Sequence, residues 1–241
     1  MKRADWFTDW FNTKYYHILY KDRNDVDARV FMQNITSFIQ LPKGSHIADI
    51  PCGKGRHSVF LNSLGYTVTG IDLSENSIAY AKQFENKNLR FFVKDMRLPL
   101  QNKYDAVFNL FTSFGYLEHD SEDILVLENF KNGLKKNAVL VMDFLNVEKI
   151  RQNIVTDEVK VVDGIVFSIR REIENGVILK YISFEAEGKK HAYTEYVKYI
   201  DLPKMKTHYE KVNLKIHHIF GDYQLNRFDE NTSNRLILVA S

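Results

Sequence analysis

The sequence predicts an α/β protein with a Rossmann-like sheet of seven strands, a terminal antiparallel hairpin and a small inserted antiparallel β-sheet. Short apolar runs alternate with amphipathic segments between residues 40 and 150, which is typical of a parallel sheet covered by helices. Between Val155 and Tyr199 the pattern changes to apolar–polar alternation, and Asn175-Gly176 separates two such runs as a hairpin turn would. A third run, from Tyr193 to Ile200, completes the small sheet. The strands expected in the large sheet are residues 47–49, 66–71, 89–93, 104–110, 138–144, 215–220 and 235–240.

Helical periodicity fills the segments between these strands. Apolar residues recur at helical intervals from Asp25 to Gln40, and a Pro-Lys-Gly turn follows. Ser74 is a candidate N-cap for a helix that runs to Phe84. Further helices are expected at residues 122–134 and 205–212.

The composition limits what the chain can be and what it can bind. Its 241 residues are 44% hydrophobic, which is enough for one α/β domain with an elaboration. The 33 basic and 31 acidic side chains leave a net charge of +2, so nucleic acid is disfavoured as a partner. A single cysteine, the lack of an apolar N-terminal stretch and the lack of an apolar run of about 20 residues favour a cytoplasmic protein with no membrane partner.

The chain is organised around the stretch from Ile47 to Ser58, where a short strand ends in Asp49 and the chain turns through Gly53 and Gly55 into a helix. Glycines let the backbone lie against a ligand, and a helix N-terminus offers unpaired N–H groups, so this loop suits a nucleotide or a carboxylate. The same composition also occurs in ordinary turns. A dinucleotide fingerprint requires a third glycine where this chain has Ser58, which argues against NAD.

The pattern D-x-x-x-G-x-G from Asp49 to Gly55, with Asp72 at the tip of the next strand, resembles the S-adenosylmethionine (SAM) site of class I methyltransferases. The closest likeness is to small-molecule N-methyltransferases. The resemblance implies SAM as cofactor, with Asp72 on the ribose hydroxyls, Asp95 accepting from the adenine amino group and Met96 donating its backbone N–H to the ring. The cofactor-binding residues that it implies are Tyr16, Asp49, Pro51, Cys52, Gly53, Gly55, Asp72, Leu73, Asp95, Met96, Arg97, Asn109, Leu110 and Phe114.

Aromatic residues are dense in the segment that precedes the first strand. The run from Tyr15 to Tyr20 resembles the tyrosine-containing N-terminal cap of small-molecule N-methyltransferases. The resemblance implies a lid over the cofactor, with Tyr16 against SAM and Tyr20 in a catalytic role. Aromatic faces also attract a sulfonium cation. Packing in the core or at an interface is the alternative explanation of this segment, and the sequence leaves both open.

Histidine offers one candidate for a general base. His119 lies just beyond the loop after the fourth strand, although a histidine between Glu118 and Asp120 is also typical of a solvated surface. His217 and His218 lie on a strand and have no metal-ligand partners at a suitable spacing, so no metal is expected.

The resemblance implies transfer of a methyl group from SAM to a small-molecule acceptor, an amine or a hydroxyl, by direct displacement. The expected parts are an N-terminal helical lid (residues 1–40), a SAM-binding core (41–154 and 201–241) and an inserted sheet (155–200), which also offers a homodimer contact. Two other classes stay open, namely a SAM-binding or dimerising module without catalysis and an NAD-binding oxidoreductase.

Overall fold

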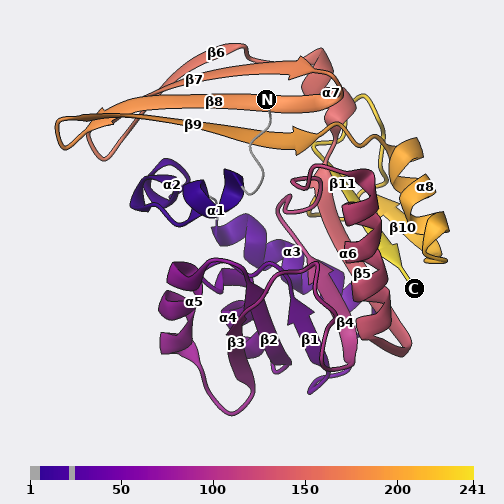
Figure 1. Cartoon of the computed structure of the whole chain (residues 1–241). Coiled ribbons are helices and arrows are strands. Elements are labelled where there is room, and N and C mark those ends of the chain that lie inside the picture. The colour runs from indigo at the N-terminus through magenta and orange to yellow at the C-terminus, as the bar shows by residue number, and fades with distance from the viewer. Residues whose placement is uncertain (1–5, 22–24) are drawn as a thin grey trace.

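The structure, a computed structural model, describes residues 6–21 and 25–241. It has a large sheet covered by helices and a separate four-stranded antiparallel sheet, with two short N-terminal helices beneath the four-stranded sheet (Figure 1). The parts of the expected N-terminal lid at residues 1–5 and 22–24 lie outside the described residues.

The large sheet has the order β10-β11-β5-β4-β1-β2-β3. The pairs β1–β2, β1–β4, β2–β3 and β4–β5 are parallel, whereas β11 runs antiparallel to both of its neighbours. This confirms the expected parallel sheet with a terminal antiparallel hairpin. The strands are β1 His46–Asp49, β2 Thr67–Asp72, β3 Leu89–Val93, β4 Tyr104–Asn109, β5 Leu134–Leu145, β10 Ile216–Phe220 and β11 Arg235–Ala240.

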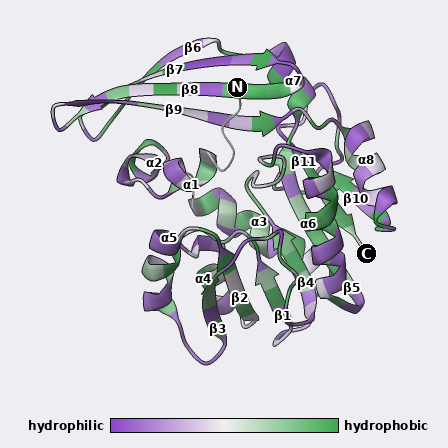
Figure 2. Cartoon of the chain, viewed as in Figure 1, coloured by the Kyte–Doolittle hydropathy of each residue, from purple (hydrophilic) through white to green (hydrophobic). Residues whose placement is uncertain are grey.

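Successive residues of the central strands point to opposite faces of the sheet, and each face has its own core. Val107 belongs to the cluster that packs with helices α6 and α8, whereas Phe108 belongs to the cluster that packs with α3, α4 and α5. Figure 2 shows the central strands β1 and β4 as largely hydrophobic. The helices are α3 Asp25–Phe38, α4 Arg56–Ser63, α5 Glu75–Ala81, α6 Asp120–Gly133, α7 Val147–Gln152 and α8 Leu202–Lys211.

The inserted sheet has the order β6-β7-β8-β9. The turn between β7 and β8 has positive φ at both Asn175 (49°) and Gly176 (73°), as a tight hairpin with this sequence requires. The sequence indicated three strands here, and the structure adds β6, whose Val159 and Val161 face solvent and so carry no core pattern. The strands are β6 Asp157–Val162, β7 Ile165–Glu174, β8 Val177–Ala186 and β9 Lys189–Lys198.

Helices α1 (Trp6–Phe11) and α2 (Lys14–Leu19) lie directly beneath the inserted sheet (Figure 1). The Trp10 ring stacks on Tyr193 with centroids 4.4 Å apart, and the Tyr15 ring lies 4.8 Å from Phe184. These contacts form a third hydrophobic cluster, separate from the two that cover the large sheet. Among the described residues, no helix combines the length and apolar character that crossing a bilayer requires.

Candidate active site

A cavity of about 360 Å³ lies where β1, β2, β3 and β4 end and where α1 and α2 approach the sheet. Carboxyl ends of parallel strands meet at one edge of an open sheet, which is where such folds bind ligands. Many residues of the expected site line this cavity together: Tyr16, Tyr20, Pro51, Cys52, Gly53, Asp72, Leu73, Asp95, Met96 and Leu110. The other expected residues are not in its lining: Asp49, Gly55, Arg97, Asn109, Phe114 and His119.

The two glycines of the loop after β1 have different tasks. Both have positive φ, 55° at Gly53 and 83° at Gly55. A Cβ on Gly53 would meet no heavy atom within 4 Å, so this residue leaves open space on the cavity side. A Cβ on Gly55 would lie 2.7 Å from the Phe91 ring, so Gly55 lets the loop and α4 pack against β3. Gly55 therefore shapes the loop from behind the cavity.

Asp72 joins the ends of two strands across the cavity wall. Its carboxylate accepts the backbone N–H of Gly53 at 2.7 Å and that of Ser74 at 2.8 Å. Burial raises the pKa of Asp72, and these backbone hydrogen bonds lower it in part. Ser74 also caps α5 through a hydrogen bond from the Ser77 N–H, as the sequence predicted. The carboxylate is thus held in a fixed position from which it can accept hydroxyl groups of a ligand.

Asp49 lies beneath the loop and outside the cavity lining, so the expectation of a direct cofactor contact from this residue has no support in the geometry. It is fully buried, and the Ser58 hydroxyl donates to its carboxylate at 2.6 Å. Burial raises the pKa of Asp49 to about 7, with a further contribution from the charge of Asp72. The loop after β1 therefore rests on a carboxyl group that titrates near neutral pH.

Asp95 and Met96 line the cavity at the end of β3. Arg97 is not in the cavity lining. Its Nε and Nη2 donate to the same carboxylate oxygen of Asp95, at 2.9 and 2.6 Å. A further bond of 3.3 Å joins Arg97 to Glu122 of α6. Arg97 therefore fixes Asp95 and is not itself placed to touch a ligand.

Cys52 lines the cavity but is buried. Burial raises the pKa of its thiol well above the usual range, so the thiol stays protonated and is a poor nucleophile.

The loop after β4 has a strained backbone that the sequence did not reveal. Phe111 and Thr112 both have positive φ, 61° and 58°, although neither is a glycine. Asp143 accepts the Phe111 N–H at 3.1 Å and the Arg235 guanidinium at 2.7 Å, and Arg235 also donates to the Thr112 hydroxyl at 2.9 Å. This buried ion pair between β5 and β11 holds the Phe111 ring at the cavity.

Two residues expected in the site from this region lie behind the cavity instead. Phe114 is buried in the core, with its ring 6.5 Å from that of Phe144. Asn109 is fully buried, and its side-chain amide donates to the Ile50 carbonyl at 2.7 Å. Both therefore support the loops of the site from within the core.

Aromatic rings form the wall of the cavity that faces the inserted sheet: Phe7, Phe11, Tyr16, Tyr20 and Tyr116. The Tyr16 ring lies between those of Phe11 and Tyr20, with centroid distances of 4.6 and 5.0 Å. Packing and cavity lining are both observed for this segment, so the two explanations of it are compatible.

His119 is exposed and precedes α6, where its backbone N–H donates to Glu122 at 3.0 Å. It does not line the cavity, so the geometry favours a role at the helix start over that of a general base. His57 does line the cavity, and its ring stacks on Phe111 at 4.8 Å.

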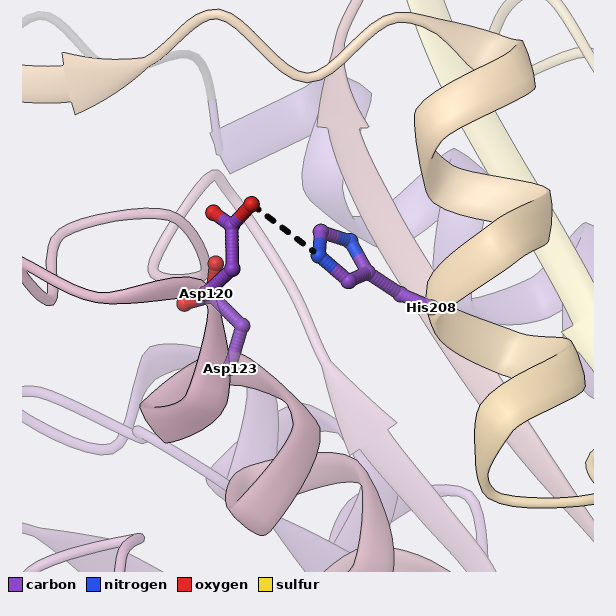
Figure 3. A group of neighbouring side chains, drawn as sticks. All are labelled: Asp120, Asp123 and His208. Carbon is purple, nitrogen blue, oxygen red and sulfur yellow. Dashed lines mark ion pairs between the residues drawn. The ribbon is translucent and has the colours of Figure 1, made fainter.

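Asp120, Asp123 and His208 gather between α6 and α8 at a spacing that could hold a metal ion (Figure 3). Two lysines already neutralise these carboxylates: Lys198 pairs with Asp123, and Lys204 lies 3.0 Å from Asp120. Burial raises the pKa of Asp123 to about 6, and the charge of Lys198 counteracts this shift. The group is therefore best described as an ion-pair cluster that ties the end of β9 to the core.

Comparison with known proteins agrees with this geometry. A model of the family described as a methyltransferase domain matches residues 41–199. A ubiquinone biosynthesis O-methyltransferase from Coxiella burnetii is 29% identical over 150 residues, which are 60% of each chain. The chain spans about half the length of the curated relatives it matches.

Solved structures of similar fold cover nearly the whole chain. A SAM-dependent methyltransferase from Clostridium acetobutylicum matches with a TM-score of 0.80 and 18% identity, covering 94% of this chain and 95% of that one. The sugar N-methyltransferase KedS8 from a Streptoalloteichus species matches with a TM-score of 0.73 and 16% identity, covering 93% and 92%. At these identities the likeness concerns the fold. Together with the family match over most of the chain, the sheet order and the strand-end cavity, it shows that this chain belongs to the SAM-dependent methyltransferases.

Proposed function

We propose that this protein transfers the methyl group of SAM to an amine or hydroxyl of a small molecule by direct displacement. One observation carries the proposal: a single cavity joins the strand-end residues expected to hold SAM with an aromatic wall that can take the acceptor. Its volume of about 360 Å³ lies within the range of roughly 300–1,000 Å³ that is common for small-molecule sites.

Each strand end has a task in this proposal. Asp72 accepts the ribose hydroxyls, and Asp95 with the Met96 N–H binds the adenine. Gly53 passes the methionine part, and the rings of Tyr16 and Tyr20 lie near the sulfonium, whose charge they attract. Methyl transfer of this kind needs positioning more than a protein nucleophile, and well-oriented reactions gain roughly 7 to 11 kcal/mol from it.

The proposed acceptor is small because residues of α1 and α2 line the cavity opposite the strand ends. The inserted sheet lies over these two helices (Figure 1). The chain is nearly neutral, so a nucleic-acid substrate is disfavoured. The likeness to a sugar N-methyltransferase supports an amine acceptor, and the likeness to an O-methyltransferase supports a hydroxyl. A cytoplasmic location and a homodimer through the inserted sheet stay predictions.

A SAM-binding module without catalysis is the second candidate. The Phe111 ring lines the cavity from a strained loop, and a ring that narrows the space for an acceptor favours this alternative. An NAD-binding oxidoreductase is excluded by the family to which the chain belongs.

Two measurements test the proposal. Titration calorimetry should show binding of SAM in the micromolar range and no binding of NAD. Labelled SAM incubated with a metabolite extract should then give a labelled small molecule. Binding without any transfer would favour the non-catalytic module, and label found only in RNA or protein would refute a small-molecule acceptor.

A further inference from the structure

Helix α2 meets the inserted sheet through a partly buried polar group as well as through aromatic packing. The Tyr20 hydroxyl donates to the Glu195 carboxylate, whose two oxygens lie 2.7 and 2.8 Å away. Lys180 Nζ donates to the same hydroxyl at 2.5 Å, and the Trp10 indole N–H donates to Glu195 at 2.7 Å. The phenol of Tyr20 is therefore held between a carboxylate from β9 and an ammonium from β8.

Aromatic packing also docks the helices against the inserted sheet. The stacking of Trp10 on Tyr193 and of Tyr15 on Phe184 already buries that surface. The side chains of Lys180 and Glu195 are only 16% and 14% exposed, and charges placed at this depth add little net stability, because desolvation offsets their attraction. Their position on the Tyr20 hydroxyl therefore calls for a functional explanation.

The group separates two cavities. Tyr20 lines the cavity that also contains Gly53, Asp72 and Asp95. Lys180 and Glu195 line a second cavity of about 560 Å³, together with charged residues of β6 and β7, namely Glu158 and Arg171. A proton that reaches the phenol oxygen from the first cavity can thus be exchanged for the phenol proton, which moves to Glu195 on the side of the second cavity.

We propose that the acceptor is a protonated amine and that Tyr20 takes its proton, with Glu195 and Lys180 as positioning residues that act through Tyr20. The ammonium N–H bond breaks and its proton goes to the Tyr20 oxygen, while the phenol proton goes to Glu195. The freed nitrogen lone pair forms the N–CH₃ bond, and the S–CH₃ electron pair stays on sulfur, so S-adenosylhomocysteine leaves. Lys180 stabilises negative charge on the phenol oxygen during the exchange. This inference rests on the methyl-transfer function proposed above.

Sinefungin is a probe that tests this arrangement without a known acceptor. It carries an ammonium group in place of the methylated sulfonium, whereas S-adenosylhomocysteine is neutral at that point. If Tyr20 and Glu195 receive an ammonium, the wild-type protein binds sinefungin more tightly than S-adenosylhomocysteine. In Glu195→Gln and in Tyr20→Phe this preference should fall by about tenfold or more, because a hydrogen bond to a charged group is lost, while the affinity for S-adenosylhomocysteine stays unchanged.

Glu187→Gln is the matched control. Glu187 also ties α2 to the inserted sheet, through Lys14 and the Tyr15 hydroxyl at 3.2 Å, but it does not line the first cavity. This variant should leave both affinities unchanged. Equal weakening of both ligands in Glu195→Gln would mean that the polar group only docks the helix, and an unchanged sinefungin preference would also overturn the proposal. Failure of the wild-type protein to bind either ligand would instead refute the proposed function.

Discussion

The two walls of the cavity are built in different ways. The strand-end wall consists of backbone loops fixed by short-range hydrogen bonds, such as those from Gly53 and Ser74 to Asp72. The opposite wall consists mainly of aromatic rings on or next to two short helices, with Tyr116 from the loop after β4. The two helices pack on a sheet that lies more than 130 residues later in the chain. Changes in the first wall should therefore act on cofactor binding, whereas changes in the second should act on the acceptor and on the sulfonium end of the cofactor.

The two walls also differ in what holds them in position. The helices α1 and α2 have six residues each, which is too short for stability without tertiary contacts. Their position depends on the inserted sheet, so that sheet and the aromatic wall form one unit. The strand-end wall is continuous with the main core and is set when that core folds.

The largest expected effect concerns Asp49, under the strand-end wall. The pKa of this buried carboxyl is raised from 3.8 to about 7, so the folded protein binds its proton more tightly than the unfolded chain does. Its contribution to stability is therefore present below about pH 4 and is lost as the pH rises to about 7. Across this pH range, the free energy of unfolding of the wild-type protein should fall, relative to that of Asp49→Asn, by at most about 4 kcal/mol. Urea unfolding of both proteins between pH 4 and pH 8 measures it.

Asp105→Asn is the control of opposite sign. Asp105 lies near the amino end of β4, at the opposite end of the strand from the cavity. Burial raises its pKa, but hydrogen bonds from Lys135 and the His46 N–H lower it on balance. Its contribution should be lost on acidification instead. A difference between wild type and Asp49→Asn that does not change with pH would show that Asp49 is ionised in the folded protein throughout.

The next effect concerns Gly55. Gly55→Ala places a Cβ 2.7 Å from the Phe91 ring at a φ of 83°, so overpacking and backbone strain combine to about 3 kcal/mol of lost stability. Gly164→Ala is the matched control, because its φ is 77° but no heavy atom lies within 4 Å of the new Cβ. It should lose only about 1 kcal/mol. Equal free energies of unfolding in the two variants would show that the loop can move away from Phe91.

Asp72→Ala should weaken SAM binding by roughly 2 kcal/mol, because the ribose hydroxyls lose a charged acceptor. Calorimetry on the folded variant measures this loss. Asp105→Ala is the control. It also removes a carboxylate that accepts a backbone N–H, but at the end of β4 opposite the cavity, so it should leave SAM affinity unchanged. Wild-type affinity in folded Asp72→Ala would mean that the ribose lies elsewhere.

The sequence was informative where the site depends on neighbours in the chain. Asp72 and Gly53 could be predicted because a strand end and a glycine turn are local patterns, and the strand-end wall follows from them. The seven strands and the terminal hairpin of the large sheet could be predicted from the same kind of local pattern, whereas their order came from the structure. Arg97 and Asn109 lie next to residues of the cavity, but their side chains bond to other parts of the protein, and no local pattern specifies this.

Long-range partners were beyond the reach of the sequence. Glu195 joins Tyr20 across 175 positions, and Arg235 reaches Thr112 across 123. No rule of sequence spacing predicts either contact. The positive φ at Phe111 could not be expected from the sequence, because the residue is not a glycine. Strand β6 was missed because its valines face solvent and give no core pattern. The aromatic wall was expected only through resemblance, and its geometry came from packing.

The smallest expected effect separates the two explanations of the aromatic wall. Tyr16→Phe keeps the ring that packs against Phe11 and Tyr20, so its free energy of unfolding should change far less than the 3 to 5 kcal/mol that a ring deletion costs. If the hydroxyl contacts SAM, affinity should fall by about 1 kcal/mol. Tyr15→Phe is the control, because Tyr15 lies on the same helix but packs on Phe184 away from the cavity. Calorimetry with SAM and thermal unfolding of both variants decide the matter: equal, wild-type SAM affinities would leave Tyr16 with packing alone, whereas a loss confined to Tyr16→Phe would make this wall part of the cofactor site.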